Sequence, residues 1–127
     1  VLVAFQPHRY TRTHQLIEEF GAVLATADEV VLTEVYGAGE APIPGATASA
    51  IAEAVQRAGQ HAVHLVDSVD DVTEVVMQRV RPGDLVITLG AGSIGNVAGQ
   101  IIQQLQSGHF NREDTEMGGR PYFEVRN

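Results

Sequence analysis

Short apolar runs alternate along the chain with segments in which apolar residues recur at helical spacing. The apolar runs cover residues 1–6, 29–35, 62–66 and 85–89, and turn residues bound them, which is typical of buried strands. The segments between the runs are long enough for crossover helices. This order predicts an α/β, Rossmann-like fold with three layers: a mostly parallel sheet with helices on both of its faces.

Polar and glycine residues mark where the helices begin and end. We expect Thr11 or Thr13 to cap the first helix, Thr47 to cap the second and Ser68 to cap the third, because short hydroxyl side chains accept bonds from free helix N–H groups. Gly59 is expected to stop the second helix, because glycine readily adopts the left-handed conformation found there. These boundaries leave a long glycine- and proline-rich loop at residues 36–45.

Each predicted helix carries an apolar face. We expect the face of the first helix to be buried, and the same holds for the third and fourth helices. The expected core positions are Leu16, Ile17, Phe20, Val23 and Leu24, then Val72, Val75, Val76 and Val80, then Ile94, Val97, Ile101, Ile102 and Leu105.

The chain changes character after residue 106. Residues 107–119 are polar and carry several charges, so the pattern divides the chain into a folded part at 1–106 and a polar tail or extension at 107–127, part of it disordered. Tyr122, Phe123, Glu124 and Val125 predict one last short strand within this tail.

Composition narrows the possible functions. No apolar run approaches the roughly 20 residues needed to span a bilayer, and Val1 begins directly in a strand, so we expect neither a membrane span nor a signal peptide. The chain has no cysteine, which fits a reducing compartment such as the cytoplasm. A net charge of −8 argues against a nucleic-acid partner. The chain also has no lysine, so it cannot supply the lysine of a phosphate-binding P-loop.

The turn after the first strand is the first candidate site. His8, Arg9 and Arg12 lie between Pro7 and the start of the first helix, at the carboxyl end of a strand, where open α/β sheets bind ligands. A guanidinium presents a planar fork that suits a carboxylate or a phosphate. The alternative is a simple helix start with exposed arginines.

The long loop is the second candidate. The glycines of this loop, Gly39 among them, allow a backbone to approach a ligand closely, Tyr36 would form a wall, and Glu40 could accept from a cationic or hydroxyl group. An ordinary surface loop, with Glu40 solvated or paired with a nearby arginine, is the other interpretation.

The third candidate is a glycine-rich turn after the fourth predicted strand. Gly90, Gly92 and Gly95 have the spacing of a dinucleotide fingerprint, which suggests a nicotinamide-dinucleotide-binding domain as an alternative function. That fingerprint normally follows the first strand and needs an acidic residue about 20 positions later, at the end of the next strand. Here Gly90, Ala91 and Gly92 are better interpreted as a tight turn beside another ligand, and the fold as one that does not bind dinucleotides.

The remaining histidines indicate no metal site. His61 and His64 flank a predicted strand, and none of the histidines has a partner at metal-ligand spacing.

Three segments together carry a resemblance to a known family. FQPHRYTRT at residues 5–13, EVYGAGEAPI at 34–43 and GDLVITLGAG at 83–92 resemble, in order and spacing, the Mur ligases of peptidoglycan synthesis, and among them those that add L-alanine to UDP-N-acetylmuramate. The resemblance covers residues 1–106, and it implies the C-terminal, Rossmann-like domain of a three-domain enzyme. The central domain of that enzyme carries the P-loop.

The resemblance also implies a reaction and a site. ATP and Mg²⁺, bound mainly by the central domain, would support an acyl phosphate on the muramoyl carboxylate, which the amino group of L-alanine then attacks. His8, Arg9 and Arg12 would hold the L-alanine carboxylate and lie near the transferred phosphate. The loops with Tyr36, Gly39 and Glu40, and with Gly90, Ala91 and Gly92, would border the amino-acid pocket. The domain itself would position the substrate and close over the ATP site, with no catalytic residue of its own assigned.

The sequence departs from the family pattern at its start. Family members carry a strand, a turn and a helix just before the position of Val1, so part of the domain and of the alanine site lies outside this chain. We therefore expect the isolated chain to have no ligase activity. A non-catalytic interaction module remains as a further alternative, and the sequence does not indicate an oligomeric state.

Overall fold

A computed structural model describes residues 1–90, 93–106 and 124–126 of the chain, whose elements strictly alternate along the first hundred residues. The elements in chain order are β1 (Leu2–Phe5), α1 (Tyr10–Leu24), β2 (Glu29–Thr33), α2 (Ala48–Arg57), β3 (Val63–Val66), the 3₁₀ turn η1 (Val69–Asp71), α3 (Val72–Arg79), β4 (Leu85–Leu89), the 3₁₀ turn η2 (Ser93–Asn96), α4 (Val97–Gln106) and β5 (Glu124–Arg126).

The strands form one parallel sheet with the order β3-β2-β1-β4-β5. Leu2 of β1 lies opposite Glu29 on one side and Val86 on the other. From β1 the chain winds outward through β2 to β3 and then returns to place β4 on the other side of β1. The strand order therefore reverses between β1 and β4, and the carboxyl ends of these strands meet at the same edge, where such sheets bind ligands.

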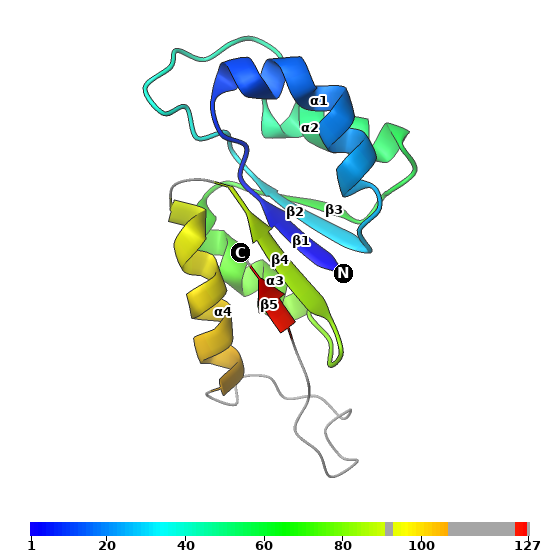
Figure 1. Ribbon diagram of the computed structural model, residues 1–127, viewed down its shortest axis with the longest axis vertical. Coiled ribbons are helices and arrows are strands. Elements are labelled where there is room, and N and C mark those ends of the chain that lie inside the picture. Colours follow the sequence, from blue (N-terminus) through cyan, green and yellow to red (C-terminus); the bar gives the residue numbers. More distant parts are fainter. Residues whose placement is uncertain (91–92, 107–123, 127) are drawn as a thin grey trace.

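Helices cover both faces of the sheet, which confirms the predicted three-layer α/β fold (Figure 1). Helices α1 and α2 lie on one face, and α3 and α4 lie on the other. Alternate residues of β1 point to opposite faces, as a strand requires: Leu2 and Ala4 pack with α3 and α4, whereas Val3 and Phe5 pack with α1 and α2. Gly21 of α1 lies so close to Ala54 of α2 that a Cβ at Gly21 would come within 2.6 Å of the Ala54 Cβ.

Several of the predicted core positions are confirmed. Val72, Val76 and Val80 are fully buried, and Val75 packs against them in part. Two predictions are wrong: Val23 is 68% exposed and Ile102 is 38% exposed. Both residues lie at the margin of a helix face, where helical spacing alone does not tell whether a neighbouring element covers the side chain.

The predicted caps have mixed outcomes. The Thr47 hydroxyl accepts from the Ala50 N–H at 3.1 Å and caps α2 as predicted. Ser68 makes no such bond and precedes η1, so the third helix begins three residues later than expected. The last strand is confirmed in part: β5 pairs with β4, while Tyr122 and Phe123 lie outside the described residues. The proposed division at residue 106 stays a prediction.

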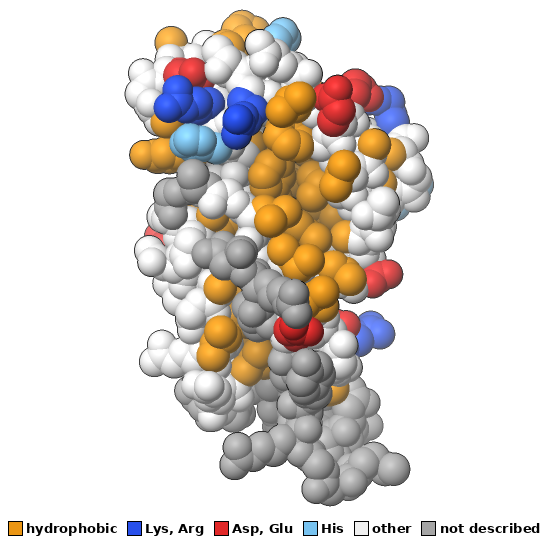
Figure 2. All heavy atoms as spheres, in the orientation of Figure 1, with side chains coloured by type: hydrophobic (Ala, Val, Ile, Leu, Met, Phe, Trp, Pro, Cys, Tyr) orange, Lys and Arg blue, Asp and Glu red, His pale blue; other side chains and the backbone are white. Residues whose placement is uncertain are grey.

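The surface of the α1–α2 face is partly open. Figure 2 shows hydrophobic side chains gathered in a band that runs from α1 over the neighbouring sheet. Val1 and Leu89 are each 41% exposed. Parallel sheets are normally covered on both faces, so this band is a surface that another element would be expected to cover. None of the described helices is long and apolar enough to cross a membrane.

Candidate functional site

The polypeptide after β1 is held against the polypeptide after β2. The Tyr36 N–H donates to the Pro7 carbonyl at 2.8 Å, and the Arg9 N–H donates to the Tyr36 carbonyl at 2.7 Å. His8 and Tyr36 form an isolated parallel bridge, and their rings stack with centroids 5.6 Å apart and planes 10° apart. Two of the sequence-predicted segments are therefore one structural unit at the carboxyl edge of the sheet.

Helix α1 begins at Tyr10, earlier than predicted, and neither Thr11 nor Thr13 caps it. Arg9 occupies the cap position with a φ of 68°, a left-handed conformation that strains a non-glycine residue. The Thr13 hydroxyl instead donates to the Arg9 carbonyl at 2.8 Å, within the first turn. The local sequence predicted a threonine cap because it does not show that a distant segment of the chain accepts from the free N–H groups.

That segment is the loop carrying Glu40. The Thr11 N–H donates to Glu40 Oε1 at 3.1 Å, and the Thr11 hydroxyl donates to Glu40 Oε2 at 2.9 Å. These two bonds use both carboxylate oxygens, so Glu40 caps α1 from outside the helix. The bond from the Thr11 N–H, with smaller help from the Thr11 hydroxyl, the Tyr10 N–H and the charge of Arg9, lowers the pKa of Glu40. Glu40 thus accepts from a hydroxyl group, as one of the two interpretations had it, and Arg9 acts on it only through its charge, with no ion pair between the two.

The lowered pKa predicts how stability depends on pH. A carboxyl group whose pKa is lower in the folded state stabilises the fold at neutral pH, and this contribution is lost as the pH falls through the lowered value. The free energies of unfolding of the wild type and of Glu40→Gln, measured in urea, should therefore differ most near neutral pH. The two values should become similar at pH values below the ordinary pKa of glutamate. Thr11→Val removes one of the two bonds and should weaken this pH dependence. A difference that stays constant with pH would contradict the capping role.

A cavity of about 370 Å³ opens beside the start of α1, and it brings together two of the residues predicted to hold a carboxylate. His8 and Arg12 line it together with Gly90, from the turn after β4. Figure 2 shows arginine and histidine side chains clustered at the N-terminal end of α1. Three apolar residues also line it: Phe5 from β1, and Leu16 and Phe20 from α1. We call this cavity the cationic cavity.

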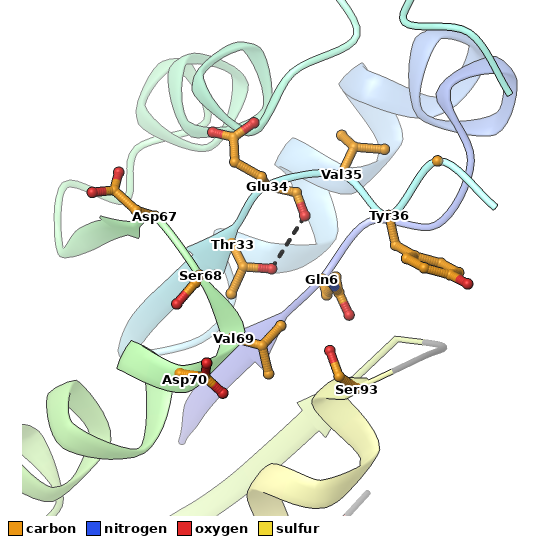
Figure 3. Close-up of a pocket in the computed structure, with 11 residues that line it drawn as sticks. Gln6, Thr33, Glu34, Val35, Tyr36, Asp67, Ser68, Val69, Asp70 and Ser93 are labelled. Carbon is orange, nitrogen blue, oxygen red and sulfur yellow. Dashed lines mark hydrogen bonds between the residues drawn. The ribbon is translucent and has the colours of Figure 1, made fainter. Parts of the chain in front are cut away.

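A second cavity, of about 330 Å³, lies at the carboxyl ends of β1, β2 and β3. Figure 3 shows it in close-up, with Tyr36 on one side and Ser93 at the bottom. Three acidic residues line it, Glu34, Asp67 and Asp70, and Figure 3 shows the carboxylates of Glu34 and Asp67 pointing away from its centre. We call it the acidic cavity. The linings of the two cavities share Gln6, a residue that is 7% exposed.

The remaining predicted site residues are placed differently. Arg9 and Gly39 are exposed, and neither lines one of the two cavities. Ala91 and Gly92 lie outside the described residues. Gly90 is at the predicted turn with a φ of 140°, and a Cβ there would come within 2.6 Å of the Gln6 carbonyl oxygen. The turn is therefore a place of close backbone approach, as glycine at this position suggested.

Sequence reasoning missed Gln6 and the apolar wall of the cationic cavity. A signal for Gln6 was present, because it is a polar residue that directly continues an otherwise apolar buried run. Leu16 and Phe20 were assigned to the core, and they are half-buried because part of each side chain faces the cavity.

Comparison with known proteins gives the family. The sequence profile of "Mur ligase, glutamate ligase domain" matches residues 1–92. The chain belongs to the Mur ligase family. This match and the place of the Gly90 turn after β4, away from the first strand of the sheet, disfavour the interpretation as a dinucleotide-binding domain.

Three curated relatives of this Mur ligase chain have the name UDP-N-acetylmuramate–L-alanine ligase. The proteins from Paraburkholderia phytofirmans, Burkholderia cenocepacia and Cupriavidus necator are 51%, 49% and 46% identical to it over 82%, 84% and 84% of its length. The aligned segment is 22% of the first relative, 23% of the second and 22% of the third. The chain thus spans less than a quarter of the relatives it matches.

Proposed function

We propose that this chain is the amino-acid-binding part of a longer cytoplasmic ligase that joins L-alanine to UDP-N-acetylmuramate. The observation that carries the proposal is the cationic cavity, where Arg12 and His8 stand beside an apolar wall. A guanidinium fork and an imidazole can bind a carboxylate, and an apolar wall suits a methyl side chain. The names of the curated relatives support the same substrate pair.

In the proposed reaction the amine of L-alanine attacks an acyl phosphate formed on the muramoyl carboxylate at the expense of ATP. A carbon–nitrogen bond forms, the carbon–oxygen bond to phosphate breaks, and the nitrogen loses a proton. The part of this chain is to hold the amino acid by its carboxylate, so that the amine has a fixed direction of approach. Arg9, exposed directly before the start of α1, would add positive potential toward the phosphate.

ATP and Mg²⁺ do not fit the described residues. No group of three or more histidine, aspartate or glutamate side chains in the described ranges is placed to hold a metal ion. The chain also has no lysine to contact the phosphates of a nucleotide. The proposal therefore assigns the nucleotide and its ion mainly to other parts of the full-length protein.

The extent of the domain before Val1 is part of the same proposal. The resemblance places a strand and a helix before Val1, and the open hydrophobic band beside β4 is a surface that such a helix would cover.

Tyr36 lines the acidic cavity and would border the amino-acid site from the side of β2.

Turnover tests the proposal. The full-length protein containing this chain should release ADP when L-alanine, UDP-N-acetylmuramate and ATP are all present, and release should stop when L-alanine is omitted. The isolated chain should release none. A coupled ADP assay checks both statements. Turnover by the isolated chain, or alanine-independent ADP release by the full-length protein at the same rate, would contradict the proposal.

A further inference from the structure

Gln6 is a buried polar residue without an evident structural task. Its backbone N–H donates to the Leu89 carbonyl at 3.0 Å and so ties the end of β1 to β4. Its side-chain Oε1 is buried and has no hydrogen-bond partner among the described residues. Buried amide oxygens are normally paired, because leaving one unpaired in the folded protein is unfavourable. An unpaired acceptor at the rim of two cavities therefore points to a ligand that donates to it.

The position of Gln6 sets the kind of donor. Gln6 lines both the cationic cavity, with Arg12 and His8, and the acidic cavity. Figure 3 shows the end of the Gln6 side chain and the Ser93 hydroxyl pointing toward one another within the acidic cavity. The basic residues of one cavity suit a negative group, and the acidic residues of the other suit a positively charged group that donates hydrogen bonds. A ligand with these two groups at its two ends would therefore fit here.

We infer that Gln6 Oε1 accepts a hydrogen bond from the amino group of the amino-acid substrate while Arg12 holds its carboxylate. This inference rests on the proposed function and names the residue that fixes which end of the substrate becomes the nucleophile. The three acidic residues around the acidic cavity give this side of Gln6 a negative potential, which favours the amino end of the substrate there.

A neutral amide suits this task better than a carboxylate. An amide oxygen accepts an N–H bond from an ammonium group and from a neutral amine alike. It therefore holds the nitrogen in place after the proton needed for attack has been lost, and it leaves the lone pair free on the other side of the nitrogen. Gln6 is thus a substrate-binding residue that orients the amine.

The test compares two ligands in the full-length enzyme. L-alanine carries both end groups, whereas propionate, used as a competitive inhibitor against alanine, lacks the amino group. Gln6→Met keeps the length of the side chain and removes the acceptor, so we expect the KM for L-alanine to rise about tenfold or more. The inhibition constant of propionate should stay within about twofold, because the carboxylate site is unchanged. The matched control is Gln56→Met on the exposed side of α2, which should alter neither value.

A second variant distinguishes the loss of the hydrogen-bond acceptor from damage to the fold. Gln6→Glu keeps an oxygen acceptor at the same distance, so its KM for L-alanine should stay well below that of Gln6→Met. If Gln6→Met weakens alanine and propionate equally, or weakens neither, the inference is overturned. If Gln6→Glu is as impaired as Gln6→Met toward alanine, the acceptor role is overturned. Arg12→Ala should weaken both ligands, and if it weakens neither, the proposed function fails independently of Gln6.

Discussion

Arg12→Ala in the full-length enzyme is expected to raise the KM for L-alanine by about 10- to 150-fold. This range corresponds to the loss of a hydrogen bond between charged groups, about 1.5–3 kcal/mol. Arg12 lines the cationic cavity, and none of the bonds and ion pairs identified for the described residues ties up its guanidinium, so the side chain is available to a ligand. Steady-state kinetics with varied L-alanine, at saturating UDP-N-acetylmuramate and ATP, measure the effect.

Two further variants make the result specific. Arg12→Lys keeps the charge and loses the planar fork, so it should recover only part of the affinity for L-alanine. Arg57→Ala removes another exposed arginine, which pairs with Glu18 on α1 and lies outside both cavities, and should leave the KM unchanged. An unaltered alanine requirement in Arg12→Ala would count decisively against the carboxylate clamp.

Gly90→Ala is expected to lower the free energy of unfolding of the chain by about 3–5 kcal/mol, through backbone strain together with steric overlap. The φ of Gly90 is 140°, a conformation that residues with a side chain rarely adopt. The added Cβ would also lie 2.6 Å from the Gln6 carbonyl oxygen and 2.9 Å from the Ile94 Cγ2. Because the first of these atoms belongs to the backbone of the central strand region, it cannot move aside easily. Urea unfolding measures the loss.

Gly59→Ala is the matched control for this substitution. Gly59 also has a positive φ, 107°, but a Cβ there would meet nothing within 4 Å. Its replacement therefore reports backbone strain alone and should cost about 1–2 kcal/mol. The difference between the two variants isolates the close approach of Gly90 to Gln6. Equal losses in both variants would show that this contact has no energetic importance.

The strands and the helices that connect them were predictable because they depend on the short-range pattern of apolar and polar residues. Four apolar runs separated by helical segments predict a parallel sheet with covered faces, and the structure has this arrangement. Thr47 was predictable as a cap because its partner, Ala50, is three residues away. The cap of α1 was not, because Glu40 is 29 residues from Thr11 and reaches it only once β1 and β2 are paired.

The site shows the same division. The sequence by itself determined that His8 and Arg12 follow a buried strand and that Gly90 follows another, which was enough to indicate an anion-binding edge. Only the tertiary structure decided that these residues share one cavity, that Arg9 stays outside it, and that Gln6 lies between two cavities of unlike charge. The physical reason is that the local sequence fixes the direction in which neighbouring side chains point. Which distant side chains come into contact, and which become buried, depends on how strands β1, β2 and β4 are brought together in space.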